Sequence, residues 1–168
     1  MGRLELGLMG AVRRNHALEH ATLHVLTERF PGMRLVGRSD WGGFTLYGPV
    51  ETAQVSEAVT AAMTRLRAGE KELAIHPHCG TNLATGFVLA GVASSAVLGG
   101  RRRSRLEKVL ELVIGVGAAL SVAQPLGAEV QRVVTTDPDV SRLIVSRILR
   151  LERGTVVVHR VETVQGHG

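Results

Sequence analysis

Two apolar segments, LATGFVLAGVASSAVLGG (83–100) and VLELVIGVGAALSVAQPLGA (109–128), flank the basic segment RRRSRLEK (101–108). Glu111 is the only charged residue in the two apolar parts. As helices, 18 to 20 residues span about 27–30 Å, the thickness of a bilayer core. Neither part has a polar stripe, so the sequence predicts a transmembrane helical hairpin at 83–128. A buried soluble hairpin is the alternative, but the 122 residues outside 83–128 are few to cover two fully apolar helices.

The charge of the chain is concentrated in the loop of this hairpin. The 168 residues carry 20 Lys and Arg against 15 Asp and Glu, a net charge of +5. The loop at 101–108 contributes four of these five charges, and aromatic residues make up only 3% of the chain. These features argue against a nucleic-acid-binding surface. A hydrophobic content of 45% excludes a disordered chain, and a single cysteine excludes an internal disulfide framework.

The orientation of the hairpin is left open by two opposing features. Short basic loops favour the cytoplasmic side, which would place both termini outside the cytoplasm. The first 80 residues, however, carry nine Arg or Lys and no cleavable leader, which disfavours their translocation. The sequence therefore predicts a two-pass cell-membrane protein without assigning a side to its polar domain.

The segments on either side of the hairpin, 1–82 and 129–168, are expected to fold together as one α+β domain, because a 40-residue tail is too short to fold alone. The first is predicted to contain a helix, a β-hairpin, a second helix and a strand, at 11–29, 33–48, 51–68 and 72–76. The second is predicted to supply strands, at 130–136, 142–152 and 155–164. His159, in the last of these strands, is expected at the surface.

The clearest chemical pattern is NHALEHAT at 15–22. On a helix, His16 and His20 are one turn apart and could chelate one Zn²⁺. Glu19 is close enough on the helix surface to act as general base toward a metal-bound water. His24 extends the row by another turn. The alternative is a structural one, in which these histidines bond to backbone or carboxylate groups or face water.

A second cluster, HPHCGTN, runs from His76 to Asn82. In an extended strand His76 and His78 project to one face, and Cys79 precedes an expected helix N-terminus that would favour its thiolate. His76, His78 and Cys79 are therefore candidates for the remaining zinc ligands. The alternatives are a His78–Cys79 thiol–imidazole pair and a polar cap on the first apolar helix, which Thr81 or Asn82 would begin.

The segments RNHALEHATLHVL, HPHCGTNLATG and HRVET together resemble an uncharacterised bacterial family of small membrane-associated proteins with an N-x-L-E-H-A-T type motif. That resemblance implies membrane association and no particular reaction. The H-x-x-E-H pattern is also locally similar to the inverzincin metalloproteases. The similarity covers five residues, and the further glutamate ligand of that family would fall in the first apolar helix, which has none.

The leading functional hypothesis is a membrane-anchored zinc protein, with hydrolysis by Glu19 as the implied chemistry. A non-catalytic membrane adaptor or assembly factor, with structural histidines, is the alternative. The expected partners are the lipid bilayer and either a membrane protein or a second copy of the chain, with no nucleic acid.

Overall fold

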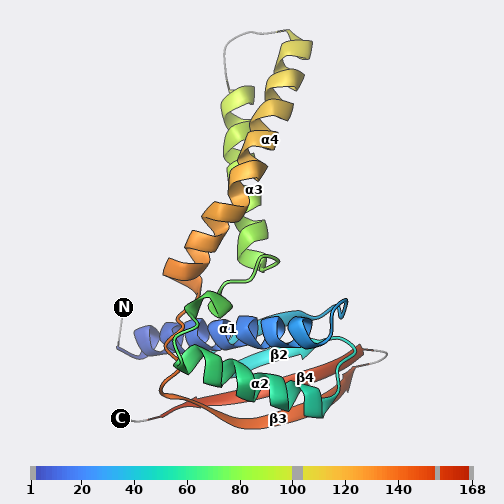
Figure 1. Cartoon of the computed structure of the whole chain (residues 1–168). Coiled ribbons are helices and arrows are strands. Elements are labelled where there is room, and N and C mark those ends of the chain that lie inside the picture. Colours follow the sequence, from blue (N-terminus) through green and yellow to red (C-terminus); the bar gives the residue numbers. More distant parts are fainter. Residues whose placement is uncertain (1–2, 100–103, 154–155, 167–168) are drawn as a thin grey trace. The chain divides into compact units, whose positions relative to one another are not determined.

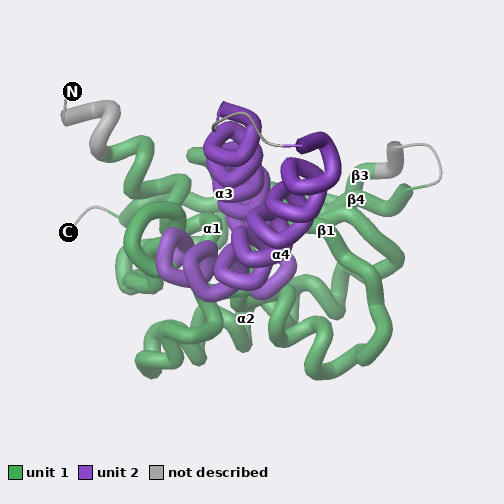
Figure 2. Tube along the Cα trace, turned by 90° about the horizontal axis from the view of Figure 1, so that it is seen from above, with its two compact units in different colours: residues 1–76, 132–168 green, residues 77–131 purple. Residues whose placement is uncertain are grey.

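The computed structural model describes residues 3–99, 104–153 and 156–166, which form two compact units. Figure 2 shows them in separate colours: Met1–His76 with Arg132–Gly168, and Pro77–Gln131. Residues 101–103, the first three arginines of the predicted basic loop, lie outside the described residues.

The first unit is built on a four-stranded antiparallel sheet with strand order β1-β2-β4-β3. Its strands are β1 (Val36–Asp40), β2 (Gly43–Tyr47), β3 (Leu143–Arg153) and β4 (Val156–Gln165). In the central pair, Phe44 is opposite Val161 and Leu46 is opposite His159. The beginning and the end of the chain therefore share one sheet. This confirms the predicted α+β class, with two apolar helices inserted between the halves.

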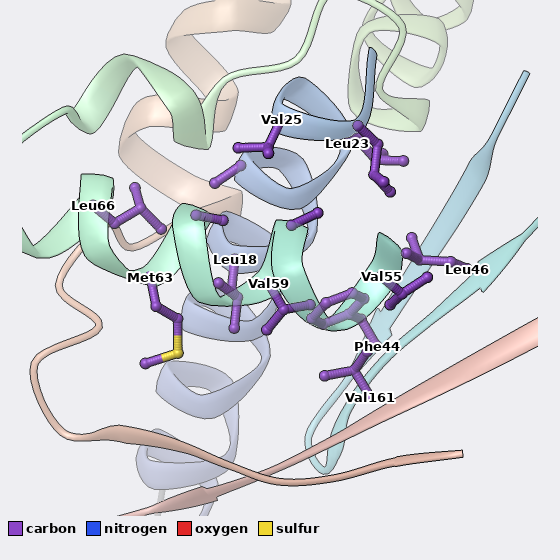
Figure 3. Close-up of a cluster of buried hydrophobic side chains, with 14 of the residues drawn as sticks. Leu18, Leu23, Val25, Phe44, Leu46, Val55, Val59, Met63, Leu66 and Val161 are labelled. Atoms are coloured by element: carbon purple, nitrogen blue, oxygen red, sulfur yellow. The ribbon is translucent and has the colours of Figure 1, made fainter. Parts of the chain in front are cut away.

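Helices α1 (Arg3–Arg29) and α2 (Thr52–Arg67) pack against each other on one face of this sheet, as Figure 1 shows. Figure 3 shows how their apolar stripes meet the inward side chains of the strands. Leu18 of α1, Val55 of α2 and Phe44 of β2 are fully buried there. Burial of such side chains contributes about 1.5–3 kcal/mol each, so this core holds α1 firmly in place.

Asn15 adds a polar tie between α1 and the sheet. Its buried amide donates to the backbone carbonyl of Asp40 at 2.8 Å and accepts from the Thr163 hydroxyl at 2.7 Å. The residue that opens the histidine motif thus fixes α1 to the end of the sheet where β1 turns into β2 and lies beside β4.

Two predicted strands are wrong. Residues 72–76 do not form a strand, because Lys71–Ala74 is a short 3-10 helix, η1. The carbonyls of Ala74 and Ile75 bond to imidazoles of α1 instead of a strand partner. Residues 130–136 are not a strand either, because α4 (Arg105–Val130) continues into a π-helical turn, η2 (Gln131–Thr135). The Arg13 guanidinium caps that turn by donating to the carbonyls of Val133 and Thr136.

The second unit is a hairpin of α3 (Gly80–Leu98) and α4. The two helices approach closely at small residues: a Cβ atom added at Gly86 would lie 3.6 Å from the Cβ atom of Ala123. Outward-facing side chains such as Phe87 and Ile114 are each 70% exposed. By length and composition alone, α3 and the continuous helical segment Arg105–Thr135 could each cross a membrane.

Candidate functional site

The candidate site of the first unit is a cluster of four imidazole rings on and beside α1. His16, His20 and His24 lie at successive turns of α1, and the rings of His16 and His20 have centroids 4.2 Å apart. The ring of His76 lies 5.6 Å from that of His20 and 5.1 Å from that of His24. His76 reaches this position because η1 packs on α1 through Leu73 and Ala74.

Three of the four imidazoles are anchored by backbone carbonyls. His16 Nδ1 lies 3.0 Å from the carbonyl oxygen of Thr135, and His20 Nδ1 lies 2.7 Å from that of Ala74. His24 Nε2 lies 2.8 Å from the carbonyl oxygen of Ile75.

A carbonyl oxygen only accepts hydrogen bonds, so in each case the bonded ring nitrogen carries the proton. A neutral ring then has its lone pair on the other nitrogen: Nε2 in His16 and His20, and Nδ1 in His24. Imidazoles that bind metals commonly donate their second ring N–H in this way, which fixes both the tautomer and the orientation of the ring.

His20 is held in the neutral form. Its side chain is only 1% exposed, and burial lowers the pKa of His20 to about 3, with further lowering from the neighbouring His16. The bond to the Ala74 carbonyl opposes this lowering but does not reverse it. At neutral pH the ring is therefore an uncharged imidazole, the form that binds metal ions.

His16 and His20 also satisfy the distance requirement for a chelate. A ring nitrogen of one lies within 4.8 Å of a ring nitrogen of the other. Zinc–nitrogen bonds are about 2.0–2.1 Å long, so small side-chain rotations bring both nitrogens to one ion. The structure thus brings together three of the predicted ligands, His16, His20 and His76, and adds His24 to them.

Glu19 points toward β1. It is only 4% exposed, and the hydroxyl of Ser39 donates to its Oε2 atom. Gly37 makes room for this carboxyl group, because a Cβ atom there would collide with Glu19 Oε1. Burial raises the pKa of Glu19, while the bond from Ser39 and the charge of His16 act in the opposite direction.

His78 and Cys79 belong to the second unit. Cys79 is the N-cap of α3, and its Sγ accepts from the backbone N–H of Thr81 at 3.4 Å. The prediction that Thr81 or Asn82 would cap this helix is therefore wrong, because Asn82 instead donates to the carbonyl of Pro77 at 2.8 Å.

His159 is fully buried, so its predicted surface position is wrong. It lies under the start of α2, where its Nε2 atom is 3.0 Å from the hydroxyl of Thr52. Burial lowers the pKa of His159, followed by the charge of Arg150. It faces the helices because residues two apart on β4 share a face, and Val161 on the same strand is a core residue.

The i, i+4, i+8 spacing alone places His24 on the same face of α1 as His16 and His20, although it does not assign His24 as a ligand. The three anchoring carbonyls could not be found in this way. They lie 119, 54 and 51 residues away from their histidines in the sequence, and backbone groups leave no signature in side-chain identity.

Comparison with known proteins places the chain among domains of unknown function. It belongs to the family described as Domain of unknown function (DUF6391), which matches residues 11–148. It is also 38% identical over 135 residues to an uncharacterized protein of Picosynechococcus sp. (strain ATCC 27264 / PCC 7002 / PR-6). The match covers 74% of this chain and 65% of that relative, so the chain spans less than two thirds of the relative's length.

No solved structure matches the chain. The predicted membership of an uncharacterised family is thereby confirmed. Because the family's description states no activity, the function has to be argued from the site itself.

Proposed function

We propose that the chain is a small membrane-anchored protein that binds a zinc ion through the histidine row of α1. His16 and His20 are its first two ligands, and His76 is a candidate for a further one. The observation that carries this proposal is the anchoring of His16, His20 and His24 by backbone carbonyls, which leaves one lone-pair nitrogen on each neutral ring. His78 and Cys79 are further candidate ligands on the sequence alone, since they lie two and three residues after His76.

Zinc fits this set of donors better than the harder divalent ions. Neutral imidazoles suit zinc and other transition metals, whereas Mg²⁺ and Ca²⁺ prefer oxygen ligands. His20 offers a neutral imidazole throughout the physiological pH range, because protonation of its ring requires acid far below neutrality.

Membrane anchoring through α3 and α4 is the second part of the proposal. It is supported by the length and apolar composition of both helices and by the small share, 11%, of each candidate span that is buried within the chain. Apolar helices that the protein itself leaves uncovered need another apolar environment, which a bilayer supplies.

Glu19 is the proposed general base if the site is hydrolytic. Its raised pKa suits a proton acceptor that works nearer neutral pH than an ordinary carboxylate. Its bond from Ser39 favours a positioning role instead. Glu19→Gln should separate zinc binding from hydrolysis, because it should leave zinc binding intact and abolish only hydrolysis.

A structural adaptor is the second candidate, and the same carbonyl bonds favour it. They tie the end of η1 and the end of η2 to α1, which would stabilise the fold without any metal. The two candidates differ in one measurable property, the affinity for zinc.

The test is a competition between the detergent-purified full chain and a chromophoric zinc chelator. His20→Asn keeps a side-chain N–H for the Ala74 carbonyl but removes the lone-pair nitrogen. It should weaken the tightest zinc site at least about tenfold. His159→Gln removes a buried histidine outside the row and should leave the affinity unchanged. Equal zinc affinity in wild type and His20→Asn would overturn the zinc proposal and favour the adaptor.

A further inference from the structure

The histidine row is too long for one metal ion. His16 and His24 are eight residues apart on α1, about 12 Å along the helix axis at 1.5 Å per residue. With metal–nitrogen bonds of about 2.0–2.1 Å, a single ion cannot be bound by both ends of the row. When His20, in the middle, binds the same ion as His16, His24 needs another partner to act as a ligand.

His76 is that partner. Its ring centroid is 5.1 Å from that of His24, which is closer than its 5.6 Å separation from His20. The bond from His24 Nε2 to the Ile75 carbonyl assigns the lone pair of a neutral His24 ring to Nδ1. His24 is thus prepared as a ligand in the same way as His16 and His20, but with its ring nitrogens in the opposite roles.

Access to solvent differs along the row. His20 in the middle is buried, whereas His16, His24 and His76 are all partly exposed. An ion bound between His24 and His76 could therefore complete its coordination with water and exchange with the solution, as a metal site needs an access path.

We propose that His24 and His76 form a second metal position, distinct from the one at His16 and His20. This inference rests on the proposed zinc function of the row and extends it to two ions. The second position holds a divalent transition-metal ion with two imidazole ligands and water. It takes His76 as its own ligand, and it binds more weakly than the first because both of its histidines are partly exposed to water, whereas the first includes the buried His20, and because the two cations repel each other.

Calorimetric titration of the metal-free full chain with zinc, in detergent, tests this directly. Wild type should show two binding steps, the second at least about tenfold weaker than the first. His24→Gln should lose the second step and keep the first within about twofold, because a glutamine amide can still donate to the Ile75 carbonyl. Gel filtration and circular dichroism of the same samples check that the variant is folded.

His16→Asn separates failure of this inference from failure of the proposed function. It should lose the tight step and keep the weak one. A single step in wild type that survives His24→Gln, or two steps that both survive it, would overturn the second position and leave the first intact. A tight step that survives His16→Asn, or no binding by wild type, would overturn the proposed zinc function itself.

Discussion

Acidification should destabilise the metal-free protein, and His20 should account for a defined part of the loss. The folded-state pKa of His20 is about 3, whereas an unfolded histidine has a pKa of about 6.5. Between these values the unfolded chain binds more protons at this position than the folded chain does. The contribution of His20 to stability is therefore complete above about pH 6.5 and is lost progressively as the pH falls toward 3.

The size of the effect follows from the same two values. Each pH unit inside this window changes the free energy of unfolding by about 1.4 kcal/mol for one proton. Between pH 7 and pH 5 the loss from His20 alone is about 2 kcal/mol, because the window opens only near pH 6.5. The free energy of unfolding of a typical domain is about 5–15 kcal/mol, so this loss is a large share of it.

The assay is urea unfolding of the full chain in mild detergent with a chelator, followed by circular dichroism at pH 7 and pH 5. His20→Asn is the reference, because asparagine does not titrate but still offers an N–H to the Ala74 carbonyl. Wild type should lose about 2 kcal/mol more than His20→Asn over this range. The other ionisable groups are the same in both proteins, so their contributions largely cancel in the comparison. An equal loss in both proteins would show that His20 is not kept neutral by burial.

Two further substitutions test how α1 is held on the sheet, both by urea unfolding at pH 7. Gly37→Ala should destabilise by about 1–3 kcal/mol, because its Cβ atom would collide with the buried carboxyl group of Glu19. Gly42→Ala is its control and should change stability by less than about 0.5 kcal/mol, since its Cβ atom would lie 3.3 Å from the end of the Arg160 side chain and in ordinary contact with the Asp40 carboxylate; equal effects would refute the collision. Asn15→Ala should cost about 2–4 kcal/mol, because it removes both buried bonds of the amide, including that from Thr163. A cost below about 1 kcal/mol would show that these bonds do not hold α1.

Local patterns predicted the elements whose burial follows a simple period. The apolar stripe of α2 is visible in the sequence because helical spacing decides which of its residues are covered. The helices α3 and α4 are visible because long segments of them are apolar on every side. The turn between β1 and β2 was predictable for the same local reason, since Asp40, Trp41 and Gly42 interrupt two β-type runs.

The two wrong strands failed because distant groups outweigh local preference. The β-branched residues near Val133 favour a strand, yet Arg13 of α1 donates to the carbonyls at this helix end and satisfies them there. Just before His76, the carbonyls of Ala74 and Ile75 bond to imidazoles that lie 54 and 51 residues away in the sequence, and not to a neighbouring strand. A single sequence contains the donors but not their long-range pairing.

The candidate site was predictable only in the part that depends on local spacing. Helical spacing placed His16, His20 and His24 on one face, because that geometry depends only on residue number. The approach of His76 to this face was an expectation that depended on tertiary packing, and the ring centroids now give it a distance. The neutral state of His20 required burial and neighbouring charges, which no local pattern specifies.

X-ray absorption at the zinc edge shows which atoms bind the ion. The metal-free full chain would be loaded with one equivalent of zinc in detergent and measured beside His20→Asn. Ligation by the histidine row predicts a nitrogen shell at about 2.0–2.1 Å with the outer-shell scattering of imidazole rings, and a loss of imidazole scattering in the variant. A shell of oxygen atoms without imidazole scattering in wild type, or the same spectrum in both proteins, would contradict the claim that this row binds zinc.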